Sequence, residues 1–288
     1  MAIVLVTGSS TGIGLATATA LSKNGHTVYA TMRNPQNAAG LKQYAEKEKI
    51  SLHLVAMDVD SDLSVSQVIS SIIEKEGRID VLINNAGIAA IASVEDTTLD
   101  LFRSVMETNY FGTIRCIKAV LPAMRELRSG IIINVASVAG KIYGQSHGAY
   151  CGSKAAVEAL SESLAQELAP FNIRVAVVEP GVIGTPIFNK SNTIPTDSKY
   201  PHTRRLRAFF AASLQSAAKP EVVACVISDI VDGKTKSFRN PAGPDAAPLL
   251  NWRLNTADED WINAHNIDDE AWIRSQEEFL HLNVRPYM

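Results

Sequence analysis

Short apolar runs rich in β-branched residues alternate along this chain with longer segments in which apolar residues recur at helical spacing. The runs that we expect to form strands are Ile3–Val6, Thr27–Thr31, Leu52–Met57, Val81–Ile83, Ile131–Val135 and Val175–Val178. The segments with helical spacing are Gly14–Lys23, Gln36–Lys47, Leu63–Lys75 and Ala155–Leu168. Uninterrupted apolar runs are typical of parallel strands that are buried on both faces. The alternation therefore predicts an α/β fold with a doubly wound parallel sheet and helices on both faces.

The chain has 288 residues and shows no repeat, low-complexity tract or linker that would divide it, so we expect a single domain over 1–288. Two regions depart from the alternation: Thr185–Ala218 and the tail from Asn240 onward. The tail holds all three tryptophans, and such aromatic residues usually anchor packing.

The charge of the chain limits the partners that it can bind. There are 27 basic and 30 acidic side chains, a formal net charge of −3, so no overall field attracts nucleic acid or an anionic membrane. Cys116, Cys151 and Cys225 are far apart and form no zinc or disulfide pattern, which indicates a reducing, cytoplasmic location and no metal site. No apolar run reaches the roughly 18 residues that a membrane span needs. A small-molecule partner fits best.

Three glycines stand where the first strand turns into a helix. Gly8, Gly12 and Gly14 allow a tight turn and the close approach of a pyrophosphate, while the helix N-terminus attracts its charge. The spacing Gly-x-x-x-Gly-x-Gly differs from the commoner dinucleotide fingerprint, and a turn without a ligand is the alternative. The segment nevertheless favours a phosphate-binding turn.

Polar residues follow the later strands, at the edge where open parallel sheets bind ligands. Residues 84–87 read Asn-Asn-Ala-Gly and follow the fourth strand, Asn109 comes next, and Ser137 follows the fifth strand. Tyr150 and Lys154 open the following helix, one turn apart on one face. An ammonium about 4 Å from the phenol would contribute roughly 4 kcal/mol at a dielectric near 20. We therefore expect Lys154 to lower the pKa of Tyr150 toward neutrality, where proton transfer is efficient.

Taken in order, these motifs resemble those of the classical short-chain dehydrogenase/reductase family over about residues 1–190. The resemblance implies a Rossmann fold and hydride transfer between a nicotinamide cofactor and a carbonyl or alcohol. It makes Tyr150 the acid/base, places Ser137 on the substrate oxygen, and assigns Lys154 also to the nicotinamide ribose. Asn109 would anchor a water, although an asparagine that only bends its helix is the alternative. Cys151 is interpreted as a packing residue.

The resemblance also implies which residues contact the cofactor. Those expected at the phosphates and at the loop after the fourth strand are Gly8, Ser10, Thr11, Gly12, Ile13, Gly14, Asn85, Ala86 and Gly87. Asp58 and Val59 are expected at the adenine. The residues expected at the nicotinamide are Pro180, Gly181, Val182 and Thr185, together with Tyr150 and Lys154.

The choice between NAD(H) and NADP(H) depends on the end of the second strand. An acidic residue there would bind the ribose hydroxyls of NAD and repel a 2′-phosphate, and none is present. Arg33 offers a permanent charge and several donors, so NADP(H) is favoured over NAD(H). The alternative is that Arg33 is an ordinary solvated loop residue.

The family places a substrate-covering lid at about 185–218, and we regard 240–288 as a C-terminal extension. Expected pocket residues are Ile142, Tyr143, His147, Ile187 and Phe188. Arg204, Arg205 and Arg207 either grip an anionic group or lie on a solvated helix face. The tail either roofs the pocket or contacts another subunit. By resemblance, the protein is a homodimer or homotetramer.

Three functions are compatible with the sequence. The leading hypothesis is an NADPH-dependent ketone or aldehyde reductase for a bulky lipophilic substrate, similar to hydroxysteroid, retinol and carbonyl reductases of the family. The second is the same chemistry in the oxidative direction, as an NAD(P)-dependent alcohol dehydrogenase. The third is a non-catalytic NADP-binding regulator, which the intact set Asn109, Ser137, Tyr150 and Lys154 disfavours.

Overall fold

The computed structural model describes residues 1–48, 50–187 and 198–288, and its centre is one seven-stranded sheet. The strands are β1 (Ile3–Val6), β2 (Thr27–Met32), β3 (Leu52–Ala56), β4 (Val81–Asn84), β5 (Gly130–Val135), β6 (Ile173–Pro180) and β7 (Arg239–Ala242). Their order is β3-β2-β1-β4-β5-β6-β7, and every neighbouring pair is parallel. The chain reverses its direction of travel across the sheet between β1 and β4, which is where such sheets bind ligands.

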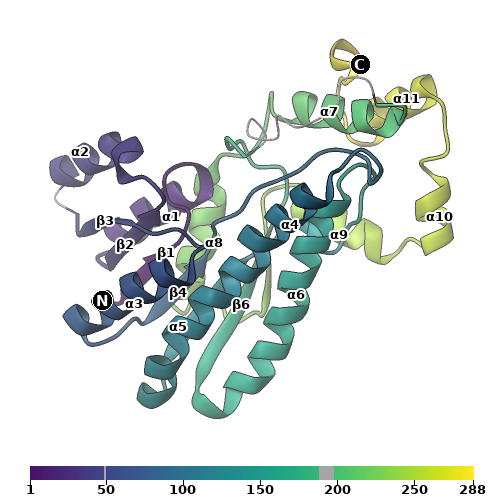
Figure 1. The fold of residues 1–288 in the computed structure, drawn as a ribbon. Helices are drawn as coiled ribbons and strands as arrows, with labels where there is room; N and C mark the ends of the chain where they lie inside the picture. The colour runs from purple at the N-terminus through teal and green to yellow at the C-terminus, as the bar shows by residue number, and fades with distance from the viewer. Residues whose placement is uncertain (49, 188–197) are drawn as a thin grey trace.

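Helices cover both faces of this sheet (Figure 1). The α-helices are α1 (Gly12–Lys23), α2 (Ala39–Glu48), α3 (Asp62–Glu76), α4 (Leu99–Met106), α5 (Gly112–Leu127), α6 (Gly148–Leu168), α7 (Pro201–Ser213), α8 (Pro220–Val231), α9 (Ala246–Leu254), α10 (Asp258–Asn263) and α11 (Asp269–Phe279). Short turns are η1 (Pro35–Ala38), η2 (Glu107–Phe111), η3 (Val138–Gly140), η4 (Ala169–Phe171) and η6 (Arg285–Tyr287). Within the described ranges, no helix combines the length and apolarity of a membrane span.

Alternation along each strand divides the core into two layers. In β1, Val4 and Val6 pack with α1 and α8, whereas Ile3 and Leu5 pack with α3 and α5. All four side chains are buried, so the strand is apolar at every position. The predicted doubly wound parallel sheet is therefore confirmed.

β1 has the predicted bounds, and the other five predicted strands differ from the observed ones by one or two residues at one or both ends. β4 continues to Asn84 and β6 to Pro180, because these residues still pair with β5 and β7. Helix α6 begins at Gly148, so Tyr150 and Lys154 both lie in its first two turns, as predicted. The last strand, β7, includes residues 240–242, so the tail departs from the sheet only after Ala242. From there it folds into α9, α10 and α11.

The tail packs against α7, the helix in the predicted lid region. Trp272 and Ile273 of α11 form a buried cluster with Ala208 and Ala212 of α7. Figure 1 shows α11 and α7 side by side, away from the sheet. The tail therefore supports α7; the lid role of this helix and a role for the tail between subunits stay predictions.

The arginines of α7 divide between the predicted solvated face, where Arg207 lies, and contacts with the tail that the sequence did not predict. Arg205 is only 3% exposed and donates to Asp269 Oδ1 at 2.8 Å and to the Ile267 carbonyl at 2.7 Å. Arg204 pairs with the same carboxylate. The anionic group that these arginines bind therefore belongs to the chain's own tail, while Arg207 is exposed.

Candidate active site and cofactor cleft

The turn between β1 and α1 needs glycine at two positions. Gly8 has φ of 68° and Gly12 has φ of 58°, in the left-handed region that side chains disfavour. A Cβ on Gly8 would lie 2.7 Å from the Ala86 Cα. Thr11 is the N-cap of α1 and makes no side-chain capping bond, so the first N–H groups of the helix remain available to an anion. The turn fits a phosphate group.

A threonine and an asparagine fix this turn to the loop after β4. The Thr7 Oγ1 accepts from the N–H groups of Asn85 and Ala86, each at 3.0 Å. The Asn85 side-chain amide donates to the carbonyls of Thr7 at 2.9 Å and Gly8 at 3.2 Å. A Cβ on Gly14 would lie 2.5 Å from that amide nitrogen, so α1 begins in direct contact with it.

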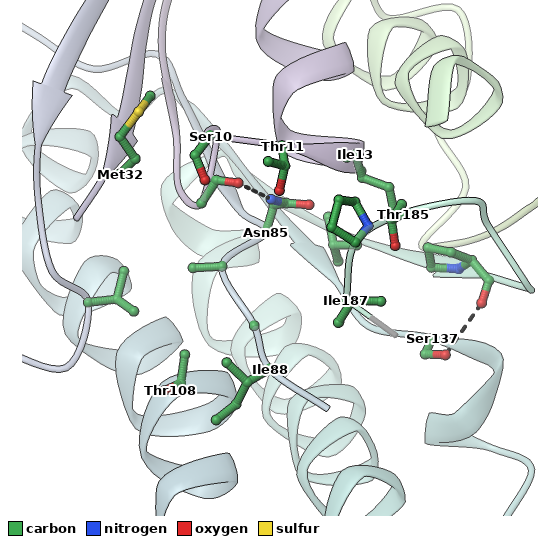
Figure 2. A pocket seen from close by; sticks show the side chains of 18 of the residues that line it. Ser10, Thr11, Ile13, Met32, Asn85, Ile88, Thr108, Ser137, Thr185 and Ile187 are labelled. Atoms are coloured by element: carbon green, nitrogen blue, oxygen red, sulfur yellow. Dashed lines mark hydrogen bonds between the residues drawn. The ribbon is translucent and has the colours of Figure 1, made fainter. Parts of the chain in front are cut away.

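Together these segments form one cleft along the carboxyl edge of the sheet (Figure 2). Met32 lies at one end and Ser137 at the other, with Asn85 between them. The predicted residues that line the cleft are Gly8, Ser10, Thr11, Gly12, Ile13, Arg33, Asp58, Val59, Asn85, Ala86, Gly87, Ser137, Tyr150, Lys154, Pro180, Gly181, Thr185 and Ile187. Gly14, Asn109 and Val182 are not among the lining residues. Gly14 lies against Asn85, the Asn109 amide donates to the Ile88 carbonyl, and the Val182 N–H donates to Asp245.

Arg33 and Asp60 mark the end of the cleft that lies beyond β2 and β3. Arg33 is exposed and follows Met32, and Asp60 follows Asp58 and Val59. Burial raises the pKa of the Asp60 carboxyl, while the Thr108 hydroxyl, which donates to it at 3.0 Å, and the charge of Arg33 oppose this shift. The first residue after β2 at this end of the cleft is therefore the cation Arg33 and not an acidic residue.

The other end of the cleft is shaped by the segment after β6. Val182 donates its N–H to the Asp245 Oδ2 at 2.8 Å, and a Cβ on Gly181 would lie 2.2 Å from the same carboxylate. The side chain of Thr185 lies against Gly12, where an added Cβ would be 3.1 Å away. The segment after β6 is thereby fixed both to the tail and to the glycine turn.

Ser137, Tyr150 and Lys154 meet at this end of the cleft. The Ser137 Oγ accepts from the Ala139 N–H at 3.1 Å and donates to the Pro180 carbonyl at 3.4 Å. Ser137 also hydrogen-bonds with the Tyr150 side chain. The Lys154 Nζ lies 5.7 Å from the centre of the Tyr150 ring. The sheet therefore brings together the three side chains that the sequence predicted as a group.

The prediction that Lys154 lowers the pKa of Tyr150 is wrong for this structure. Burial raises the pKa of Tyr150 to about 12, and the hydrogen bond with Ser137 only partly opposes the shift. Lys154 donates to the Val135 carbonyl at 2.8 Å instead of to the phenol. Burial lowers the pKa of Lys154 itself to about 8. Tyr150 is consequently protonated at neutral pH and can act as a proton donor.

Asn109 lies in a π-helical turn, η2, which interrupts α4 and α5. Its side-chain amide donates to the Ile88 carbonyl at 2.9 Å and to the Ser153 Oγ at 2.9 Å, and its Oδ1 accepts from the Ile88 N–H at 2.8 Å. Asn109 thus joins the loop after β4 to the helix that carries Tyr150. Its predicted water-anchoring role stays a prediction.

The predicted substrate pocket is only partly described. Ile187 lines the cleft, while Ile142, Tyr143 and His147 belong to the loop between η3 and α6. Tyr143 is half exposed, and His147 is buried against Tyr150. Phe188 lies outside the described residues.

Comparison with known proteins identifies the family. The family model described as short chain dehydrogenase matches residues 2–195. The protein belongs to the short-chain dehydrogenase family. It is therefore an oxidoreductase of a family that binds a nicotinamide cofactor and acts on alcohols and ketones.

The similarity of this short-chain dehydrogenase to known proteins extends beyond the matched region. It is 39% identical to oxidoreductase BOA17 of Botryotinia fuckeliana, over 90% of this chain and 96% of that protein. It is 36% identical to the 3-ketodihydrosphingosine reductase of Bacteroides thetaiotaomicron, over 84% of this chain and 88% of that protein. A short-chain dehydrogenase from Streptomyces avermitilis has a similar structure, with a TM-score of 0.79, 29% identity and coverage of 97% of this chain and 98% of that one.

Sequence reasoning missed three residues that shape this dehydrogenase's cleft. Thr7 directly precedes the glycine motif, but its two backbone contacts are with a loop almost 80 residues away. Asp245 and Asp60 gave no local signal, because their partners come from distant segments. Only the fold brings these pairs together.

The contact between Gly181 and Asp245 predicts the effect of a single methyl group. Gly181→Ala must displace the carboxylate that holds Val182, so we expect the affinity for the reduced nicotinamide cofactor, measured by fluorescence titration, to fall at least about tenfold. Gly184→Ala is the matched control in the same segment, because its Cβ would make an ordinary 3.6 Å contact with Ala217. Equal affinities of the two variants would contradict the assigned role of this contact.

Proposed function

We propose that this short-chain dehydrogenase reduces a ketone or aldehyde on a bulky, lipophilic molecule with NADPH, using Tyr150 as the general acid. The observation that carries the proposal is the meeting of Ser137, Tyr150 and Lys154 at one end of the cofactor cleft. When bound, the reduced nicotinamide supplies the hydride for the carbonyl carbon. The chain's own side chains manage the charge and the proton on the oxygen.

Tyr150 and Ser137 act on the substrate oxygen in this scheme. Tyr150, protonated at neutral pH, donates its proton to the oxygen as negative charge develops there. Ser137 is positioned by the Ala139 N–H, and its hydroxyl proton turns from the Pro180 carbonyl, 3.4 Å away, to the same substrate oxygen. Lys154 is 5% exposed and lines the same cleft, where it would hold a ribose hydroxyl of the cofactor. Asn109 fixes the position of the loop at Ile88 relative to α6 through its hydrogen bonds with Ile88 and Ser153.

Residues after β2 support NADPH as the cofactor, and the cleft wall supports a lipophilic substrate. Arg33 is an exposed cation at the end where the adenosine ribose is expected. Ile88, Ile183 and Ile187 contribute apolar surface near the proposed reaction site. The relative named as a 3-ketodihydrosphingosine reductase agrees with reduction of a ketone.

Two alternative functions are weaker. The same groups support the oxidative direction, in which Tyr150 must first lose its proton, and its high pKa disfavours that state. A non-catalytic NADP-binding regulator has no need for Ser137, Tyr150 and Lys154 to converge. The expected cytoplasmic location and the homodimeric or homotetrameric state stay predictions.

The reaction assigned to Tyr150 is tested with Tyr150→Phe, which keeps the ring and removes the proton. We expect the rate of NADPH oxidation with a ketone substrate to fall about 10²- to 10⁴-fold, because the general acid is lost. The NADPH dissociation constant should stay within about threefold, since the phenol is one of many groups in the cleft. The proposal does not survive if the variant turns over at the parental rate.

Cofactor preference is tested with Arg33→Gln. We expect kcat/KM for NADPH to fall about 10- to 100-fold and kcat/KM for NADH to change little, because only NADPH carries the 2′-phosphate. Arg274→Gln, an exposed arginine on α11, is the matched control for the loss of one positive charge. A parallel loss with both cofactors would contradict the assignment of Arg33 to the phosphate.

A further inference from the structure

His147 is placed directly beside the proposed acid by the start of α6. Its carbonyl accepts the Cys151 N–H at 2.9 Å, which makes it the N-cap residue of that helix. Its imidazole is stacked on the Tyr150 ring, with centroids 4.8 Å apart and an interplanar angle of 15°. The two polar ring systems therefore lie side by side.

The opposite side of the imidazole is packed by the lid helix. Phe210 of α7 contacts it edge to face, with centroids 5.7 Å apart and an angle of 70°. The preceding residue, Ser146, shares a 3.0 Å hydrogen bond with Thr203, also in α7. His147 is only 9% exposed, so its ring has a fixed place between α6 and α7.

This buried ring is neutral at physiological pH, because burial lowers the pKa of His147 to about 4. A neutral imidazole carries one N–H donor and one acceptor nitrogen. Over residues 1–48, 50–187 and 198–288, no hydrogen bond is found to either nitrogen, and the aromatic contacts of the ring are those with Tyr150 and Phe210. Neither nitrogen is among the fully enclosed polar atoms, so a group from outside the protein can reach and pair with the ring.

We propose that His147 is a second polar contact of the substrate site, which hydrogen-bonds to a hydroxyl group near the reacting carbonyl and so selects hydroxyketones over simple ketones. A hydroxyl can both donate and accept, so it satisfies the ring in either tautomer. The second oxygen must lie close to the carbonyl, because the imidazole and phenol rings are stacked at 4.8 Å. The inference rests on the proposed function, since it places the carbonyl oxygen at Tyr150.

A packing role is the competing explanation, and two variants separate it from hydrogen bonding. His147→Phe keeps an aromatic ring between Tyr150 and Phe210 but removes both nitrogens. His147→Gln removes the ring but keeps a donor and an acceptor. If packing alone matters, Phe is the better replacement; if the hydrogen bond matters, Gln is the better one for selectivity.

The experiment measures kcat/KM with NADPH for 1-hydroxy-3-decanone and for 3-decanone, which differ only in the hydroxyl. We expect the parent protein to prefer the hydroxyketone about 10- to 100-fold, the ratio in His147→Phe to fall to within about threefold of one, and His147→Gln to retain an intermediate ratio. Melting temperatures of both variants report whether they fold. The ratio is taken within each variant, so a general loss of activity does not affect it.

Two results overturn the inference while leaving the proposed function intact: a parent protein that reduces both ketones with equal kcat/KM, or a His147→Phe variant that keeps the parental ratio. A parent protein that reduces neither ketone, and no aldehyde tested as a control, contradicts the proposed function and this inference together.

Discussion

The cleft depends on the close approach of two backbone turns, the one between β1 and α1 and the one after β4. Gly8 lies so near Ala86 that an added Cβ would be 2.7 Å from its Cα, and Thr7 and Asn85 hold the two turns together with four hydrogen bonds. A side chain at Gly8 would force the turns apart, and the N-terminus of α1, which lines the cleft, would move with them.

The second constraint is the burial of ionisable groups beside the cleft. Removing Tyr150 and Lys154 from water favours their neutral forms, which raises one pKa and lowers the other. The Val135 carbonyl and the hydrogen bond with Ser137 fix both side chains in place. The phenol of Tyr150 is therefore protonated at neutral pH, and His147, at the start of α6, is held between it and Phe210 of α7. Trp272 and Asp269 of the tail support α7 in turn.

The fold and most of the cleft could be predicted because their signals are local. The apolar runs of the strands, the glycine turn and the Tyr150–Lys154 spacing are each contained in a short stretch of sequence. The parallel topology then brings the glycine turn and these two side chains to one edge of the sheet. The pKa of Tyr150 could not be predicted, because burial and the actual direction of Lys154 decide it. Asp245 and the Arg205–Asp269 pair were out of reach for a related reason, since each joins segments that are more than 60 residues apart.

We propose that the cleft carries a hydride from a nicotinamide to a carbonyl carbon. To test this, the protein is incubated with a ketone and NADPH deuterated at the transferable C4 position, and the alcohol is examined by mass spectrometry and NMR. We expect one deuterium on the carbinol carbon and, in D₂O with unlabelled NADPH, none at that carbon. Alcohol that forms without the label, or with solvent deuterium on carbon, would contradict it.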